Sequence, residues 1–321
     1  MSVLDFRKPH YATANQLNPW VVTVFTLMHL GALGALFTFS WAGLITFVIL
    51  GFVCGSLGIS FTYHRLLTHT GFKAPKWLTY LGTLVACMAF EGGPVFWVST
   101  HRYHHKMSDK PLDPHSPRDG FWWSHMFWML YEHPVLSLPG AREKITADLH
   151  ADPVLMWLER NNVWIAVATF AVLYGIGYWV GGPFMGLSLL FWGGFLRVVS
   201  CWHQTWLVNS ATHALGYRNY TTQEDSTNCW WVALISFGEG WHNNHHGDPR
   251  TARFNHRWFE FDITYAWMQP LLWLGIITDF VHPRAVLKGV SLPQQAAEDD
   301  TISASIMAKL PTLAPPALTP A

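Results

Sequence analysis

A long stretch without any charged side chain most strongly limits how this chain can fold. Residues 20–63 contain no Asp, Glu, Lys or Arg, and this run is about twice the ~20 residues that one helical membrane pass requires. A turn at Ser40 and Trp41 would divide it into two spans, roughly residues 20–40 and 42–63. The sequence therefore predicts a transmembrane hairpin at the start of the chain.

A second apolar run has the same organisation. Residues 161–196 are also free of charged side chains, and a Gly-Gly-Pro sequence at 181–183 interrupts the run near its middle, where helices usually end. This indicates two further spans, roughly residues 163–181 and 184–206. Only 12% of the residues are charged, about half the share found in soluble domains. The composition thus agrees with an all-α membrane protein of four transmembrane helices in two hairpins.

The rest of the chain is assigned from its composition. Residues 1–19 are polar and lack a cleavage site after a short apolar core, so a removable signal peptide is not expected and the segment is assigned to the cytoplasm. Residues 20–290 form the predicted membrane domain, and residues 291–321, which lack periodicity, are expected to be a disordered tail. Three shorter apolar stretches are expected on the membrane surface or in a cytoplasmic helical cap: residues 77–90, 229–237 and 263–278.

The basic residues predict an orientation. All of the 20 Lys and Arg residues except Arg197 lie outside the predicted spans, in residues 1–19, 64–160 and 207–321. The two hairpin turns carry none. Because basic residues favour the cytoplasmic side of a membrane, both termini and all of the histidine clusters described next are expected on the cytoplasmic face.

Histidines are unusually frequent, and half of the 18 fall into four clusters that follow the predicted spans or lie between them. Two clusters have histidines at i, i+3 and i+4, which places three imidazoles on one face of a helix. Neutral imidazole is the commonest metal ligand. A closed structural zinc site takes four ligands, so nine rings favour two ions with vacant positions for a small molecule. The candidate ligands are His64, His69, His101, His104, His105, His213, His242, His245 and His246.

Two of the clusters need further geometry. His64 and His69 are spaced i, i+5, which separates them by about 140° on an ideal α-helix. They are expected to share a site only where the second span ends and its helical geometry relaxes. Asn209 and His213 are spaced i, i+4 at the end of the fourth span, where an amide can orient a metal-bound water. Spacing does not identify the metal, because imidazole suits zinc, copper, iron and nickel.

The remaining cysteines and histidines have simpler interpretations. Cys54, Cys87, Cys201 and Cys229 lie in apolar surroundings without CxxC spacing, and they are expected to be reduced core residues. The nine other histidines are interpreted as packing or hydrogen-bonding residues. They are His10, His29, His115, His125, His133, His150, His203, His256 and His282.

The order of the motifs HxxxxH, HxxHH, NSxxH and HxxHH resembles that of the membrane-bound fatty acyl desaturases of the stearoyl-CoA desaturase type. The resemblance covers roughly residues 20–280, and it implies a bacterial-type member in the plasma membrane. The family fold has four transmembrane helices capped by a cytoplasmic helical domain, which the apolar runs predict independently. The matching stretches beyond the histidines are residues 71–73, 113–120, 124–125, 205–210 and 238–242.

This resemblance implies an O2-dependent enzyme with two iron ions. The nine clustered histidines would be the ligands, with Asn209 acting through water. The implied reaction uses two electrons and introduces a cis double bond into a saturated acyl chain, with the delta-9 position as the family default. The signature of a cytochrome b5 module is not found in the chain, so a separate electron donor, ferredoxin-like or cytochrome b5-like, is expected.

An alkyl chain has no polar group along its length, so the reaction position must be set by a narrow apolar tunnel. The resemblance implies that Trp97, Thr205 and Trp206 bend this tunnel beside the metal ions. The second span, just before His64, is expected to supply another part of the wall, and bulk there should shorten the accepted chain. Counted back from His64 in helical turns, the expected wall residues are Ser60, Leu57, Ser56 and Val53.

One stretch departs from the family pattern. Animal members carry an Arg-Lys pair before the His-Pro that follows the Ser-His segment, and those charges suit the phosphates of coenzyme A. Here Tyr131 and Glu132 occupy these positions. Acyl-CoA and lipid-bound acyl chains therefore both remain as substrate classes. Four basic residues elsewhere can still meet phosphates: Lys73, Arg118, Arg142 and Lys144.

Two other functions would use some of the same features. A related membrane hydroxylase would use the same histidines to insert oxygen, but the NSxxH motif and the match at residues 113–120 favour a desaturase. A non-enzymatic metal carrier is expected to hold ligands inside its spans along a path, whereas these clusters lie at one surface. The net charge of zero gives no indication of nucleic-acid binding.

Overall fold

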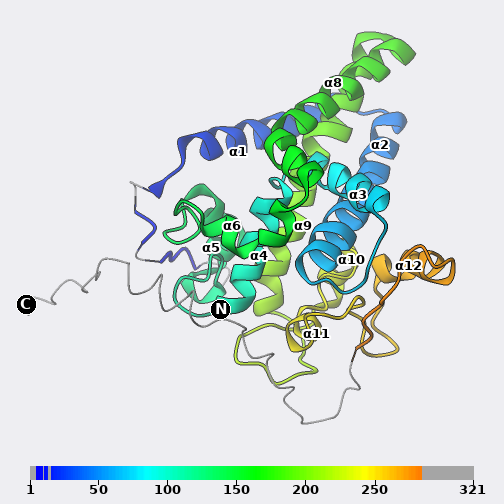
Figure 1. Cartoon of the computed structure of the whole chain (residues 1–321). Coiled ribbons are helices and arrows are strands. Elements are labelled where there is room, and N and C mark those ends of the chain that lie inside the picture. Colours follow the sequence, from blue (N-terminus) through cyan, green and yellow to red (C-terminus); the bar gives the residue numbers. More distant parts are fainter. Residues whose placement is uncertain (1–4, 10, 14–15, 284–321) are drawn as a thin grey trace, which may run out of the picture.

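The computed structural model describes residues 5–9, 11–13 and 16–283. The described residues are mostly helical and contain no strand, only four isolated β-bridges. In Figure 1 the long apolar helices α1, α2 and α8 occupy the upper part of the molecule, and the short helices α5, α6, α10 and α11 lie below them. The predicted tail at 291–321 and His10 lie outside the described residues.

The apolar elements form three continuous helical segments that are long and apolar enough to cross a membrane: Pro19–Phe37, Trp41–Thr68 and Pro153–His213. Large apolar side chains project outward from them, for example Phe37, Trp41 and Trp179. The elements of these segments are α1 (Pro19–Ala32), the 3-10 helix η2 (Leu33–Phe37), α2 (Trp41–Phe52), the π-helix η3 (Val53–Thr68), α8 (Pro153–Leu189), the π-helix η6 (Leu190–Leu196), α9 (Arg197–Ser210) and the 3-10 helix η7 (Ala211–His213).

The first two segments meet at the predicted turn. Ser40 has an extended backbone, and its side-chain oxygen accepts a hydrogen bond from the Gly43 N–H, which starts α2. At the other end of the hairpin, the Asn18 side chain accepts from Trp20 N and Val21 N and starts α1. Local capping chemistry therefore defines both helix starts.

The third segment doubles back on itself. Gly181 and Gly182 leave helical geometry, and Gly182 has a φ of 72°, a conformation that glycine adopts without a steric penalty. Pro183 follows and has no N–H to continue the hydrogen-bond pattern. A methyl group at Gly177 would lie 2.5 Å from the Met185 carbonyl oxygen, so the two limbs touch backbone to backbone.

The second segment changes from an α-helix to a π-helix after Phe52. In η3 the backbone hydrogen bonds join residues i and i+5, which gives roughly 4.4 residues per turn. The bond from His69 N to His64 O (3.1 Å) follows this pattern at the end of the helix. The Thr68 hydroxyl also donates to the carbonyl five residues earlier, on Tyr63 (2.7 Å). The second segment therefore has more residues per helical turn from its middle to the first histidine pair than an α-helix would have.

The shorter helices pack beneath and beside these segments. A core cluster that includes Phe61 of η3, Val98 of α4 and Met268 of α12 joins them. Arg65 is fully buried and donates to Asp262 (Nη1–Oδ2 2.8 Å) and Glu239 (Nη2–Oε1 3.1 Å), which anchors the end of η3. The remaining helices are α3 (Lys76–Met88), α4 (Pro94–Met107), η4 (Pro117–Asp119), α5 (Phe121–His125), η5 (Phe127–Leu130), α6 (Ala141–Ile145), α7 (Ala147–His150), α10 (Trp230–Ile235), α11 (His242–Gly247) and α12 (Ile263–Trp273).

Candidate metal centre

Four helical segments that are far apart in the sequence bring the clustered histidines together. The π-helical end of η3 places His64 and His69 on one side, with ring centroids 4.9 Å apart. The i, i+3, i+4 triplets lie on α4 and α11, as their spacing predicts, and η7 ends at His213. All nine histidines therefore lie in one region of the protein.

The first group contains five of the nine rings. Its donor nitrogens all lie within 4.8 Å of one another. The Nε2 atom of His105 lies 3.1 Å from that of His101 and 2.8 Å from that of His245. The Nε2 atom of His64 lies 3.1 Å from that of His245. The members of this first group are His64, His69, His101, His105 and His245.

The second group contains the other four rings. The donor nitrogens of His104, His242 and His246 lie within 4.8 Å of one another. The ring of His213 packs against that of His242, with centroids 5.1 Å apart. The spacing in the sequence left the division of ligands open. By the distances between donor atoms, eight of the rings form two groups, whereas His213 groups with Asp109 and Glu224 and joins the second group only through ring packing.

The nitrogens in both groups fit metal ions. A neutral imidazole carries only one N–H, so protons alone cannot satisfy the chain of close Nε2 atoms in the first group, whereas one cation among them can. In addition, the buried Nε2 atoms of His69, His104, His242 and His246 have no hydrogen-bond partner in the protein. Buried polar atoms without partners are rare, and each group contains at least one.

Burial favours the neutral form of seven of the nine rings, which is the form that binds metal. It lowers the pKa of His104 to about 3 and that of His246 to about 4. It lowers the pKa of His101, His105 and His245 well below the usual range, with the neighbouring histidines as the next cause.

Four buried carboxylates support the rings from behind, and the sequence analysis assigned none of them a role. The Nδ1 atom of His104 donates to Asp113 Oδ1 (2.8 Å), which leaves Nε2 with a lone pair for a metal. The His64 Nδ1 atom contacts Glu239 in the same way. The Nδ1 atoms of His213 and His246 lie 3.5 Å from Asp109 Oδ2 and 3.9 Å from Glu224 Oε1, respectively. Asp113 and Glu239 fall inside stretches matched by the family resemblance, which was the available signal.

A cavity reaches the first group from the side of the membrane segments. His64, His101 and His242 line one part of it, with Trp97 and Thr205 nearby. The wall also includes Glu91, whose carboxylate accepts from Trp97 Nε1 (3.1 Å) and Thr205 Oγ1 (2.9 Å). The other lining residues are Gly55, Ile59, Cys201, Gln204, Val208, Asn209, Ser236, Phe237 and Glu239.

Comparisons with known proteins agree with this geometry. The family model of fatty acid desaturases matches residues 39–275. The chain belongs to the fatty acid desaturase family. It is 44% identical over 272 residues to the sn-1 stearoyl-lipid 9-desaturase of Anabaena variabilis, which covers 84% of this chain and 95% of that protein.

Two further relatives have different substrates in their names. The sn-2 palmitoyl-lipid 9-desaturase of Nostoc sp. (strain 36) is 40% identical, over 90% of this chain and 96% of that protein. An acyl-CoA 5-desaturase of Anemone leveillei is 42% identical, over 81% of this chain and 78% of that protein. The chain is therefore an oxidoreductase that desaturates fatty acyl chains, and these matches favour neither the hydroxylase nor the metal-carrier alternative.

The wall of the desaturase cavity differs in part from the predicted tunnel. Trp97 and Thr205 line the cavity, but Trp206 is on the other side of α9, where it packs against Phe25 and Met129. The α-helical count back from His64 had selected four other residues of the second span: Ser60, Leu57, Ser56 and Val53.

The π-helix explains the difference on the second span. With i→i+5 bonding, the residues on the face of His64 are those five and nine positions earlier, Ile59 and Gly55, and both line the cavity. Ser60 instead donates to Glu239, and Ser56 bonds Thr264 (2.7 Å). Ser56 and Ser60 therefore do not line this cavity.

Three of the other histidines contact one another, and the four cysteines agree with their interpretation as core residues. His29, His203 and His125 form a chain of ring contacts, with Nε2–Nε2 3.3 Å for the first pair and Nδ1–Nε2 3.0 Å for the second. The chain ends at Ser210 Oγ, 3.0 Å from His125 Nδ1. The four cysteines are free and buried. His115 is an exception in position, because its ring packs on His104 at 4.2 Å.

Proposed function

We propose that this desaturase introduces a cis double bond at the delta-9 position of saturated acyl chains carried by membrane glycerolipids, using O2 and two iron ions. The observation that supports the chemistry is the convergence of nine histidines in two groups beside an apolar cavity. The lipid-bound substrate is supported by two relatives whose names contain it. The absence of an Arg-Lys pair at Tyr131 and Glu132 agrees with a substrate other than acyl-CoA.

Each histidine group would hold one iron ion, and Asn209 would act on the second ion through a water molecule. Bound iron would activate the O2 that oxidises an unactivated C–H bond, which no side-chain acid or base achieves. The protein would prepare the ligands: burial favours the neutral form of most of the rings, and Asp113 and Glu239 orient His104 and His64 through Nδ1.

The cavity would position the acyl chain. Ile59, Gly55 and Val208 provide an apolar wall, and the Trp97–Glu91–Thr205 contacts hold the part of the wall next to the first group. An alkyl chain gains binding energy only by burial against such a surface. The shape of the wall would therefore select which carbon atoms reach the ions.

We further propose four membrane spans, with each limb of Pro153–His213 crossing once and the reversal at Gly181 and Gly182 on the far side. The distribution of Lys and Arg supports a cytoplasmic position for the termini and the metal centre, and the membrane would be a bacterial-type plasma membrane. A separate ferredoxin-like or cytochrome b5-like protein would deliver the electrons there. Residues 291–321 would remain a disordered tail.

The direct test is fatty-acid analysis of a host that makes no 9-monoene. Expression of the chain should produce palmitoleate or oleate, detected by gas chromatography with mass spectrometry. His104→Ala removes a ring of the second group and should abolish the product. His150→Ala is the matched control, because that histidine contacts Thr146 and belongs to neither group. No new monoene with the unchanged chain in a host with electron donors would refute the function.

The acyl carrier needs a separate assay. Purified protein in lipid nanodiscs, with an electron donor, is supplied with labelled stearoyl-glycerolipid or labelled stearoyl-CoA. The proposal predicts label in lipid-bound oleate with the first substrate and little conversion of the second. Faster conversion of stearoyl-CoA would transfer the assignment to the acyl-CoA class.

A further inference from the structure

Three buried carboxylates around the second group have no basic side chain to neutralise them. Asp109, Asp113 and Glu224 expose at most 4% of their surface. Within the described residues their ion-pair partners are histidine rings, not Lys or Arg. A buried charge without an opposite charge is strongly unfavourable. The folded protein therefore requires positive charge close to these three residues.

The first group has a different environment. The carboxylate that supports the first group, Glu239, also forms an ion pair with Arg65 (Oε1–Nη2 3.1 Å). The same guanidinium forms a second ion pair with Asp262. Arg65 is fully buried between these two anions. The protein thus supplies part of the compensating charge through an ion pair beside the first group, whereas in the described part of the chain Lys and Arg form no ion pair with the three carboxylates beside the second.

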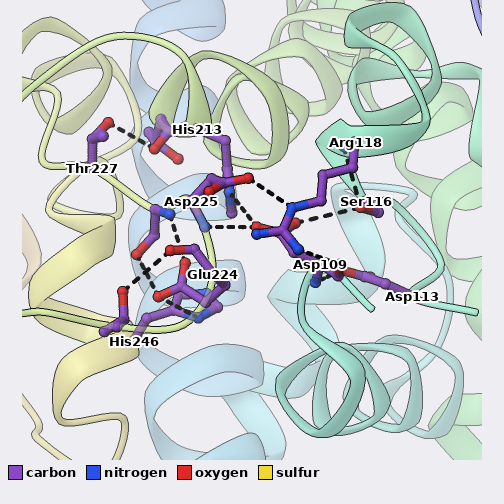
Figure 2. A network of polar contacts seen from close by, with 12 residues as sticks. Asp109, Asp113, Ser116, Arg118, His213, Glu224, Asp225, Thr227 and His246 are labelled. Atoms are coloured by element: carbon purple, nitrogen blue, oxygen red, sulfur yellow. Dashed lines mark hydrogen bonds and ion pairs between the residues drawn. The ribbon is translucent and has the colours of Figure 1, made fainter. Parts of the chain in front are cut away.

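Two guanidinium groups approach these residues and are directed elsewhere: Arg218 donates to the backbone carbonyl oxygens of Glu224 and Thr222. Figure 2 shows Arg118 extending toward Asp225, with which it pairs at 2.8 Å. It reaches Asp109 only at the backbone carbonyl oxygen (3.0 Å). The Asp109 carboxylate accepts instead from the backbone N–H of Asp225 (2.7 Å) and from Ser116 (3.4 Å).

Hydrogen bonds hold all three carboxylates in place from the outside. Glu224 accepts from the N–H and the hydroxyl of Ser226 (2.6 and 2.9 Å). Asp113 accepts from the N–H groups of Asp109 (2.8 Å) and His115 (3.2 Å). Each carboxylate therefore faces the ring nitrogens with its orientation set by a loop.

We infer that Asp109, Asp113 and Glu224 are positioning residues that retain the second metal ion, by balancing its charge through His213, His104 and His246. This rests on the proposed two-ion function. A cation bound by neutral rings provides the positive charge that the three anions lack, and the anions in turn make the rings better donors. Removing one carboxylate should lower the affinity of the protein for the second metal ion and leave the affinity for the first unchanged.

Glu224→Gln is the sharpest variant, because glutamine keeps an oxygen for the Ser226 N–H and an N–H for the Ser226 hydroxyl while losing the charge. The purified protein is loaded with Fe2+ without oxygen and dialysed against increasing concentrations of a ferrous chelator, and iron per chain is measured. The unchanged chain should begin at about two irons. The variant should lose one iron at a chelator concentration about 10- to 100-fold lower and keep the other.

A second measurement separates charge balance from a merely structural role. In the metal-free protein, Glu224→Gln removes an uncompensated buried charge, so its melting temperature should equal or exceed that of the metal-free unchanged chain. Asp225→Asn is the control: it alters the same loop at a half-exposed ion pair without touching a ring, and iron retention should not change. Asp113→Asn should repeat the selective loss of one iron, since its oxygen lies 2.8 Å from His104.

The outcomes distinguish the two proposals. An unchanged chain that binds no iron contradicts the proposed function itself. Two irons that the Glu224→Gln protein retains as well as the unchanged chain, or a variant whose metal-free form melts lower, overturn the role of the carboxylates alone.

Discussion

At the scale of single residues, Glu91 places a buried carboxyl group in the wall of the cavity. Burial raises the pKa of Glu91 to about 7, and the hydrogen bonds from Trp97 and Thr205 oppose this only in part. The carboxyl group is therefore neutral at acid pH and becomes charged as the pH rises through about 7. A charge in the wall must lose its hydration when an acyl chain fills the cavity, which is unfavourable.

We therefore expect the KM for the acyl substrate to rise between about pH 6 and pH 8. Stability changes in the same direction over a lower range: because the pKa of Glu91 is raised from 4.5 to about 7 in the folded protein, stability is lost as the pH rises from about 4.5 to about 7. Glu91→Gln should flatten both profiles, as measured by KM between about pH 6 and pH 8 and by melting temperature between about pH 4.5 and pH 7. Glu132→Gln, at an exposed position, is the control. Parallel pH profiles for Glu91→Gln and the unchanged chain would contradict this role.

The role of a residue could be predicted from the sequence where the spacing of neighbouring residues of the same type indicates it. Histidines at i, i+3 and i+4 share a helix face whatever surrounds them, so His101, His104 and His105 could be recognised from the sequence alone. Glu224 and Asp109 have no such pattern, because they reach their rings from irregular loops that are joined only by tertiary contacts. Their proposed role in balancing the charge of the second metal ion depends on their forming no ion pair with Lys or Arg in the described residues. This can be seen only in the folded structure.

At the scale of elements, the π-helix η3 decides which residues of the second segment line the cavity. The apolar runs correctly predicted two long apolar helical segments, Pro19–Phe37 and Trp41–Thr68, because length and lack of charge are visible in the sequence. The helical period was not predictable, since i→i+5 bonding has no residue signature of its own. An α-helical count therefore selected Ser60 and Ser56 in place of Ile59 and Gly55.

This difference leads to a prediction about chain length. Ile59→Trp fills the cavity and should lower the ratio of C18 to C16 products by about tenfold, the scale at which apolar pockets discriminate methylenes. Ser56→Trp should leave this ratio unchanged, because Ser56 contacts Thr264 and Trp267 outside the cavity. Products are compared by gas chromatography in a host supplying both chains. A shift with Ser56→Trp and none with Ile59→Trp would favour the α-helical count.

At the scale of the whole molecule, metal ions would link helices that are far apart in the sequence. The first group takes rings from η3, α4 and α11, and the second from α4, η7 and α11. The membrane segments have their own apolar contacts, for instance between Met28 and the tryptophans of α9. The two parts of the protein should therefore differ in how strongly they depend on metal.

Metal removal tests this division. A ligand at about 100 times its dissociation constant stabilises the folded state by about 2.7 kcal/mol, so chelation should lower the melting temperature by several degrees. The loss should be local: without cations, the close Nε2 atoms and the buried Asp109, Asp113 and Glu224 repel one another in α4, α11 and the loops at 108–119 and 221–228. Hydrogen exchange followed by mass spectrometry should accelerate there and stay slow in α1, α2 and α8. Equal acceleration in the membrane helices would mean that the apolar contacts do not hold them independently of the metal centre.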